Sequence, residues 1–331
     1  MNSPFYKVNI FYKDVFLETI SLPKPCQLKE IKFENPLICE YKISIPDVKD
    51  SSTVSYNIMA AYILDLDFCS IKFKTLLSQE SIRIIRYLDV LSFISDCDFV
   101  DNIVEIENRP RCVSYAKIIA ERSFEILRSL LINWRNKNQL ICNFLLRDLI
   151  ENIKLYLYFI RGDKKEVVLN TGQGVFIKEA NIDSVTAKIS KGLKEGNADW
   201  GFNIKEILKN NKTLGIWNDE LKKIERLNNQ CNSYIHKNGL DKISPYHIGS
   251  SPTNIKLDDI FLCAKFFFTL ITCYDGKVLA SSDYIDYLDM GEEPPIGSQC
   301  WIASICQDFI TEEYTKADIK KLKSLTYMDI Q

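Results

Sequence analysis

Several short runs within the first 76 residues carry hydrophobic side chains at every second position. The alternation is clearest at Tyr6, Val8, Ile10 and Tyr12, and shorter runs repeat it further along. The polar pair Lys13-Asp14 separates two of these runs as a tight turn would, and prolines separate the later ones. The stretch 56–73 also has a strand-like pattern, with a helix as the open alternative. The pattern predicts a β-rich N-terminal subdomain over residues 1–76.

From about Ser78 the hydrophobic positions recur every three and four residues. This spacing is typical of helices that bury one face. It predicts helices over residues 78–93, 111–135, 138–161, 217–237, 257–274 and 298–314. The fold class that we expect is mainly α, a helical bundle over residues 77–331 preceded by the smaller β-rich subdomain.

The predicted helix over 138–161 is apolar on nearly all sides. Its polar positions form a narrow strip of Asn143, Arg147, Asp148, Glu151 and Lys154. Since a helix that is apolar all round has to be covered on every side, we expect it at the centre of its domain.

Composition narrows the function classes. Hydrophobic residues make up 46% of the chain and charged residues 26%, which is the balance of a globular protein. The formal net charge of −2 argues against strong binding of duplex DNA by this chain alone, because neutralising many phosphates requires an excess of Lys and Arg.

The first residues lack the apolar segment of a secretory signal, and the most apolar run, 260–274, is too short to cross a bilayer. We expect no membrane span and a buried core helix over that run.

The 11 cysteines are scattered, and no two of them have the CxxC spacing of a zinc site. With two histidines in the chain, the cysteines are best explained as reduced thiols in the core, which indicates a cytoplasmic protein. The acidic stretch 283–293 has neither the spacing nor the glycine of a calcium loop, and is interpreted as a solvated loop. We expect neither a metal nor a cofactor.

On a helical wheel, the predicted helix over 217–237 separates a polar stripe from an apolar face. Lys222, Glu225, Asn229 and Asn232 lie within about 40° of His236, whereas Cys231 lies on the apolar face. Two interpretations stay open. The stripe is a solvated face whose histidine interacts favourably with the helix dipole, or His236 is an acid–base or phosphate-contacting group with Asn232 beside it.

Arg147 and Glu151 stand four residues apart on one face of the predicted central helix. A structural ion pair between them is one interpretation, because buried charges persist when they are paired. In the functional alternative, Glu151 orients His236 and Arg147 faces an anionic group, which requires the two helices to pack side by side. The candidate catalytic residues are therefore His236, Asn232, Arg147 and Glu151.

Two segments resemble the HEPN superfamily (higher eukaryote and prokaryote nucleotide-binding), in particular its uncharacterised bacterial members. They are Leu146-Arg-Asp-Leu-Ile-Glu151 and Cys231-Asn-Ser-Tyr-Ile-His236-Lys-Asn-Gly239, within a similarity that covers about 110–315. The superfamily motif is an Arg, commonly followed by Asn, and a His a few residues later. Asn232 and His236 match its second part, but Cys231 stands where the Arg belongs. Either another residue supplies the arginine, with Arg147 as our candidate, or the nuclease chemistry is absent.

The resemblance implies a metal-independent endoribonuclease or RNA-directed effector of bacterial defence or toxin–antitoxin systems. It also implies RNA, a partner protein or a second copy of the chain as the binding partner. The alternative is a non-catalytic helical module of a larger assembly, which binds a protein or a nucleotide. Cleavage of RNA in EDTA that is lost in His236→Ala would favour the endoribonuclease over the non-catalytic module.

Overall fold

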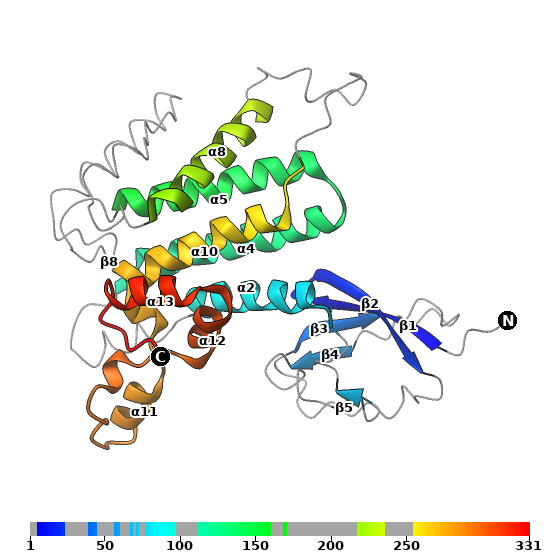
Figure 1. Ribbon diagram of the computed structural model, residues 1–331. Coiled ribbons are helices and arrows are strands. Elements are labelled where there is room, and N and C mark those ends of the chain that lie inside the picture. The colour runs from blue at the N-terminus through cyan, green and yellow to red at the C-terminus, as the bar shows by residue number, and fades with distance from the viewer. Residues whose placement is uncertain are drawn as a thin grey trace. The chain divides into compact units, whose positions relative to one another are not determined.

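A computed structural model describes the chain over residues 5–23, 39–44, 56–59, 67–68, 71–72, 77–96, 112–159, 168–170, 217–235 and 254–331 (Figure 1). These residues are mainly helical, with a small β part at the N-terminal end, as the sequence predicts. They belong to two compact units, residues 1–88 with 128–138, and residues 89–127 with 139–331. The predicted boundary after residue 76 lies just before α2 (Gln79–Ser95), whose first half belongs to the first unit.

The first unit contains a four-stranded antiparallel sheet with the strand order β2-β1-β3-β4. Its strands are β1 (Phe5–Tyr12), β2 (Val15–Pro23), β3 (Cys39–Ser44) and β4 (Tyr56–Met59). Lys13 and Asp14 join β1 to β2 with φ angles of 46° and 65°, the left-handed conformation of a two-residue hairpin turn. The predicted alternation is confirmed beside this turn, where Ile10, Tyr12, Val15 and Leu17 are buried.

The stretch 56–73 forms short strands wherever the structure describes it. After β4 come β5 (Asp67–Phe68) and β6 (Ile71–Lys72), which pair antiparallel. The strand interpretation of this stretch therefore holds there. A further pair, β7 (Cys112–Ser114) with β8 (Val168–Asn170), occupies the start of the helix predicted from residue 111, so that α4 (Tyr115–Arg135) begins later.

In the second unit, α5 (Gln139–Phe159), α8 (Asn218–Ile235) and α10 (Leu257–Tyr274) lie side by side (Figure 1). The rings of Tyr156 and Phe267 meet edge to face, with centroids 5.6 Å apart, and join α5 to α10. The buried Asn152 amide donates to the Ser123 hydroxyl (3.1 Å) and joins α5 to α4. As expected, α10 is a buried core helix, and no helix within the described ranges is long and apolar enough to cross a membrane.

The expectation that α5 is buried on all sides is wrong at its N-terminal end. Leu140, Ile141 and Phe144 are exposed, whereas Asn143 and Lys154 of the polar strip are buried. The buried positions follow one helical face, Cys142, Leu146, Leu149, Ile153 and Leu157 among them. The side of α5 that is covered is thus set by its packing partners and does not follow from hydrophobicity alone.

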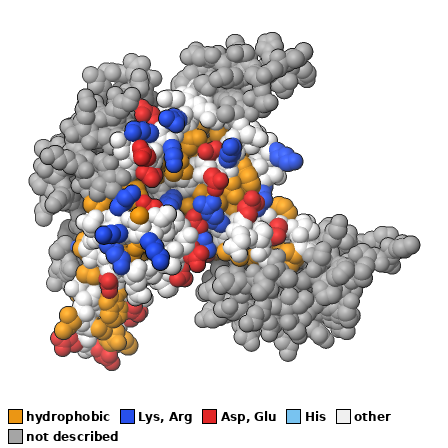
Figure 2. Space-filling model, viewed as in Figure 1, with side chains coloured by type: hydrophobic (Ala, Val, Ile, Leu, Met, Phe, Trp, Pro, Cys, Tyr) orange, Lys and Arg blue, Asp and Glu red, His pale blue; other side chains and the backbone are white. Residues whose placement is uncertain are grey.

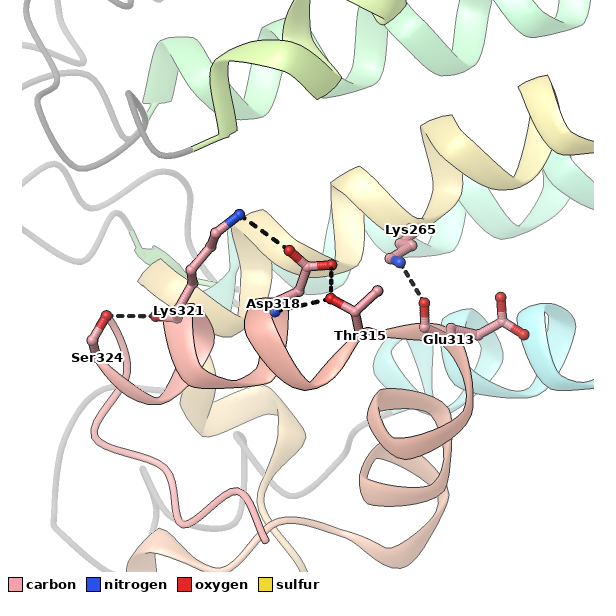
Figure 3. Close-up of polar contacts among 6 residues, drawn as sticks. All are labelled: Lys265, Glu313, Thr315, Asp318, Lys321 and Ser324. Atoms are coloured by element: carbon pink, nitrogen blue, oxygen red, sulfur yellow. Dashed lines mark hydrogen bonds and ion pairs between the residues drawn. The ribbon is translucent and has the colours of Figure 1, made fainter.

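Residues 276–323 form several short elements in place of the single helix predicted over 298–314. They are η4 (Gly276–Leu279), α11 (Asp283–Asp289), η5 (Ser298–Cys300), α12 (Ser304–Glu313) and α13 (Lys316–Lys323). Figure 3 shows how α10 holds the junction of α12 and α13: the Lys265 ammonium group donates to the Glu313 carbonyl oxygen. The same ammonium group lies over the Tyr314 ring, 4.2 Å from its centroid.

Candidate functional site

Helix α8 separates a polar stripe from an apolar face, as the wheel predicts. Lys222 and Asn229 of the stripe are exposed, and Leu221, Ile224 and Cys231 are buried. Lys222 makes an ion pair with Asp219 (3.4 Å), a surface contact of little energetic consequence. His236 lies outside the described residues, one position beyond the end of α8. The described part of the candidate site is therefore formed by Asn232, Arg147 and Glu151.

Arg147 of α5 lies close to Cys231 of α8, at the place where α10 also contributes Asp259. The pKa of the Cys231 thiol is raised to about 12, first by burial and then by the negative charge of Asp259, while the positive charge of Arg147 opposes both. Burial, the Cys231 thiol and Asp259 likewise raise the pKa of Cys263 on α10. The three helices pack against one another, so that charges on α5 and α10 act on the Cys231 thiol of α8. Arg147 is thus within electrostatic range of Cys231.

The Arg147 guanidinium group carries unused hydrogen-bonding capacity. Its Nε atom is buried without a hydrogen-bond partner, and no carboxylate of the described residues forms an ion pair with it. Buried N–H groups in native proteins are nearly always satisfied by protein, water or a ligand. A partly buried cation in this state is suited to an anionic oxygen supplied from outside the chain.

Glu151 is engaged elsewhere. Its Oε1 accepts a hydrogen bond of 2.7 Å from the Lys154 ammonium group, one turn further along α5. Lys154 is buried, which favours this pair because an unpartnered ammonium group there would be costly. The interpretation of Arg147 and Glu151 as a structural ion pair is thus wrong: the i,i+3 neighbour takes the carboxylate.

Three asparagines of α5 and α8 have buried side-chain amide oxygens without a hydrogen-bond partner among the described residues. They are Asn143 on α5, one turn before Arg147, and Asn228 and Asn232 on α8, on either side of Cys231. The Asn143 amide nitrogen is fixed, since it donates to the Gln139 carbonyl oxygen (2.7 Å). Asn228 is a residue that the wheel analysis missed. A lone amide within an otherwise apolar helix face was the signal that could have found it.

Helices α5 and α8, which pack against each other, thus carry an unpartnered N–H donor on Arg147 and unpartnered amide oxygens on three asparagines. Among the residues that the structure describes, no cluster of His, Cys, Asp and Glu could hold a metal ion. Arg147 Nε can donate a hydrogen bond to an anionic oxygen, and the amide oxygens can accept hydrogen bonds from donor groups. Comparison of the chain with protein-family models, curated proteins and solved structures found no match.

Proposed function

We propose that this chain is an RNA-directed helical protein that cleaves RNA without a metal ion. The observation that carries the proposal is the position of Arg147 beside Cys231, because the HEPN-like reading of α8 lacks an arginine at residue 231. In this proposal the guanidinium group on α5 supplies the positive charge that α8 lacks, and its Nε has hydrogen-bonding capacity for a phosphate oxygen.

In the proposed reaction the ribose 2′-hydroxyl attacks the adjacent phosphorus atom, and the bond to the 5′-oxygen of the next nucleotide breaks. His236 exchanges a proton with one of these two oxygens, for which an imidazole is suited near neutral pH. Arg147 holds a non-bridging phosphate oxygen, and its fork of N–H donors also neutralises charge that develops there. Asn232 contributes an amide hydrogen bond. Glu151 enters as the partner of Lys154 and has no proton-transfer role.

The test is cleavage of a fluorescent single-stranded RNA in EDTA. We expect the wild-type protein to cleave it, His236→Ala to abolish cleavage, and Arg147→Ala to slow it by about 10²-fold or more, the range seen when a group that stabilises developing charge is removed. Arg147→Lys should restore part of the rate, because it keeps the charge and loses the planar fork. Lys222→Ala and Asn229→Ala are matched controls at exposed stripe positions. A wild-type rate that equals that of His236→Ala contradicts the proposal.

A non-catalytic binding module is the second candidate, and the buried amide oxygens of Asn143 and Asn228 favour it. Each of these oxygens can accept a hydrogen bond from a donor group of a bound polar ligand. This function predicts binding of RNA or a nucleotide that Arg147→Ala weakens and His236→Ala leaves unchanged. Expression in bacterial cells adds a second readout, since a defence or toxin RNase arrests growth in a manner that depends on His236.

A further inference from the structure

The N-terminal part of α5 exposes a row of hydrophobic side chains. Leu140 is 46% exposed, Phe144 is 44% exposed and Ile141 is 37% exposed, so three such side chains fall within five residues. Leu140 and Phe144 lie one turn apart, within about 40° of each other on the helix, on the side opposite the buried Cys142 and Leu146. Figure 2 shows hydrophobic side chains at the surface among charged ones in the part of the molecule that holds α5 and α10. Exposed hydrophobic side chains that gather in this way mark a candidate binding surface.

Arg147 continues this row and is a charge on it without an ion-pair partner. It stands three residues after Phe144, and the Cβ atoms of residues at this spacing on a helix lie about 5–6 Å apart. The carboxylates on the same side of α5 are already engaged, since Asp148 and Glu151 each pair with another cation, at 3.4 Å and 2.7 Å. No described residue forms an ion pair with Arg147, and its Nε has no hydrogen-bond partner. An aromatic ring and an uncompensated guanidinium group therefore occupy adjacent positions on one helix face.

A nucleotide with an unpaired base matches the chemistry of both positions. The flat face of any base can stack on an aromatic ring, and a guanidinium group binds phosphate through charge-assisted hydrogen bonds. The Phe144 ring contacts no other aromatic ring within the described ranges. A base inside a duplex has both faces covered by its neighbours, so the match requires a single strand. An aliphatic surface of a partner protein would cover Phe144 but would leave Arg147 without an anion.

We propose that Phe144 stacks on the base of a nucleotide whose phosphate Arg147 binds. This inference rests on the proposed RNA-directed function and adds a residue that contacts the substrate. The stacked base belongs to one of the two nucleotides that the cleaved phosphate joins, because the short distance between Phe144 and Arg147 lets one nucleotide contact both. Purines should be favoured modestly at that position, since their larger rings stack more strongly.

The first experiment measures binding of a single-stranded 2′-O-methyl RNA by fluorescence anisotropy. This RNA lacks the attacking hydroxyl group and is not cleaved. Phe144→Ala should raise the dissociation constant by about 5-fold to about 100-fold, the range for the loss of one stack between a base and an aromatic ring. Phe144→Trp should keep the affinity, whereas Phe144→Leu, which is hydrophobic but has no ring, should lose it. Ile118→Ala, at an exposed hydrophobic position of α4, is the matched control.

The second experiment identifies the stacked base. A 2′-O-methyl oligonucleotide with a single ribonucleotide has one cleavable phosphate, and the base on each side of it is replaced in turn by an abasic sugar. For the wild-type protein, removal of the stacked base should lower kcat/KM by a factor similar to that of Phe144→Ala. In Phe144→Ala the same abasic sugar should have little further effect, because the interaction is already lost. Abasic effects of equal size in the two proteins overturn the inference.

The outcomes distinguish this inference from the proposed function. If the wild-type protein binds and cleaves RNA and Phe144→Ala does so equally well, the stacking role is wrong and the proposed RNase stands. If Phe144→Leu binds as tightly as wild type, or Leu140→Ala weakens binding as much as Phe144→Ala, the row is an aliphatic contact surface and the inference is likewise wrong. If the wild-type protein neither binds nor cleaves RNA, the inference and the proposed function are both wrong.

Discussion

The buried phenol of Tyr156 on α5 donates a hydrogen bond of 2.9 Å to Oδ2 of Asp275, the residue that ends α10. Burial raises the pKa of this phenol well above its ordinary value, and the charge of Asp275 raises it further. The hydroxyl group therefore stays protonated near neutral pH and remains a donor to Asp275. The contact joins the residue that follows α10 to the C-terminal part of α5.

We expect Tyr156→Phe to lower the free energy of unfolding by about 1.5–3 kcal/mol, the range for a hydrogen bond to a charged group. The loss arises because the Asp275 carboxylate keeps its desolvation and loses its donor. Urea unfolding measures it, with Tyr287→Phe as the matched control. Tyr287 is half-buried and its hydroxyl group makes no hydrogen bond to a described residue, so its variant should stay within about 0.5 kcal/mol of wild type. Equal effects at the two positions would contradict the assigned role of the Tyr156 hydroxyl.

Asp318 makes the attachment of α13 depend on pH. Burial on its own raises the pKa of this carboxyl group, but hydrogen bonds from Thr315 and Lys321, and the charges of Lys321 and Lys265, outweigh it and leave the pKa below its ordinary value (Figure 3). The folded state therefore binds this proton less tightly than the unfolded state. The resulting stability is present above about pH 4, the unfolded pKa of Asp, and is lost as the pH falls through the folded pKa.

Asp318→Asn should accordingly lower stability at pH 7 by about 1 kcal/mol, the size of a helix-capping contact with a partly exposed ion pair. It should also flatten the dependence of unfolding free energy on pH below about pH 4. Asp308→Asn, at an exposed position of α12, is the control. If wild type and Asp318→Asn lose stability in parallel as the pH falls, the carboxylate does not have this role.

The helices were predictable because each carries its own repeating signal. The predictions over 138–161, 217–237 and 257–274 agree with α5, α8 and α10 to within a few residues, since an apolar stripe at helical spacing is a local property of the sequence. Helices α11 and α13 were missed because seven or eight residues give too few turns for a stripe. The contact between Lys265 and the Glu313 carbonyl, which holds α10 to the residue before the α12–α13 junction, is likewise not encoded by any local pattern.

The candidate site was predictable to the extent that it lies on one helix. The wheel placed Cys231 on the apolar face of α8, and it is buried. Sequence spacing does not determine the distances between charged side chains, so it could not show which ion pairs form. Glu151 had partners available at both i−4 and i+3, and burial of Lys154 decided between them. The proximity of Arg147 to Cys231 required the packing of α5 against α8, which only the structure supplies.

Cys231 should be nearly inert toward alkylation in the native protein. With a pKa of about 12 in place of 9.0, its thiolate fraction near neutral pH is about a thousandfold below that of an ordinary thiol, and burial blocks access as well. Iodoacetamide labelling followed by peptide mapping should leave Cys231 and Cys263 unmodified while the partly exposed Cys300 reacts. When the protein is unfolded in urea, the three cysteines should be labelled to a similar extent. Fast native labelling of Cys231 would mean that α8 is not packed against α5 and α10, which would also remove Arg147 from the site.

Gly276 is required where η4 follows α10, for reasons of space. A Cβ atom there would lie 2.7 Å from Cγ of Met328 and 3.1 Å from Oγ1 of Thr326, in the C-terminal segment that covers η4. Met328 is buried and has little room to move, so Gly276→Ala should cost about 1–3 kcal/mol, as for other overpacked cores. Truncation of the obstructing side chain tests the cause: in a Met328→Ala background the same substitution should cost much less. A double-mutant cycle in urea should give a coupling energy of at least about 0.5 kcal/mol, the range for residues in contact. If the free-energy changes of the two substitutions are additive, the cost of Gly276→Ala arises from the local backbone and not from a clash with the C-terminal segment.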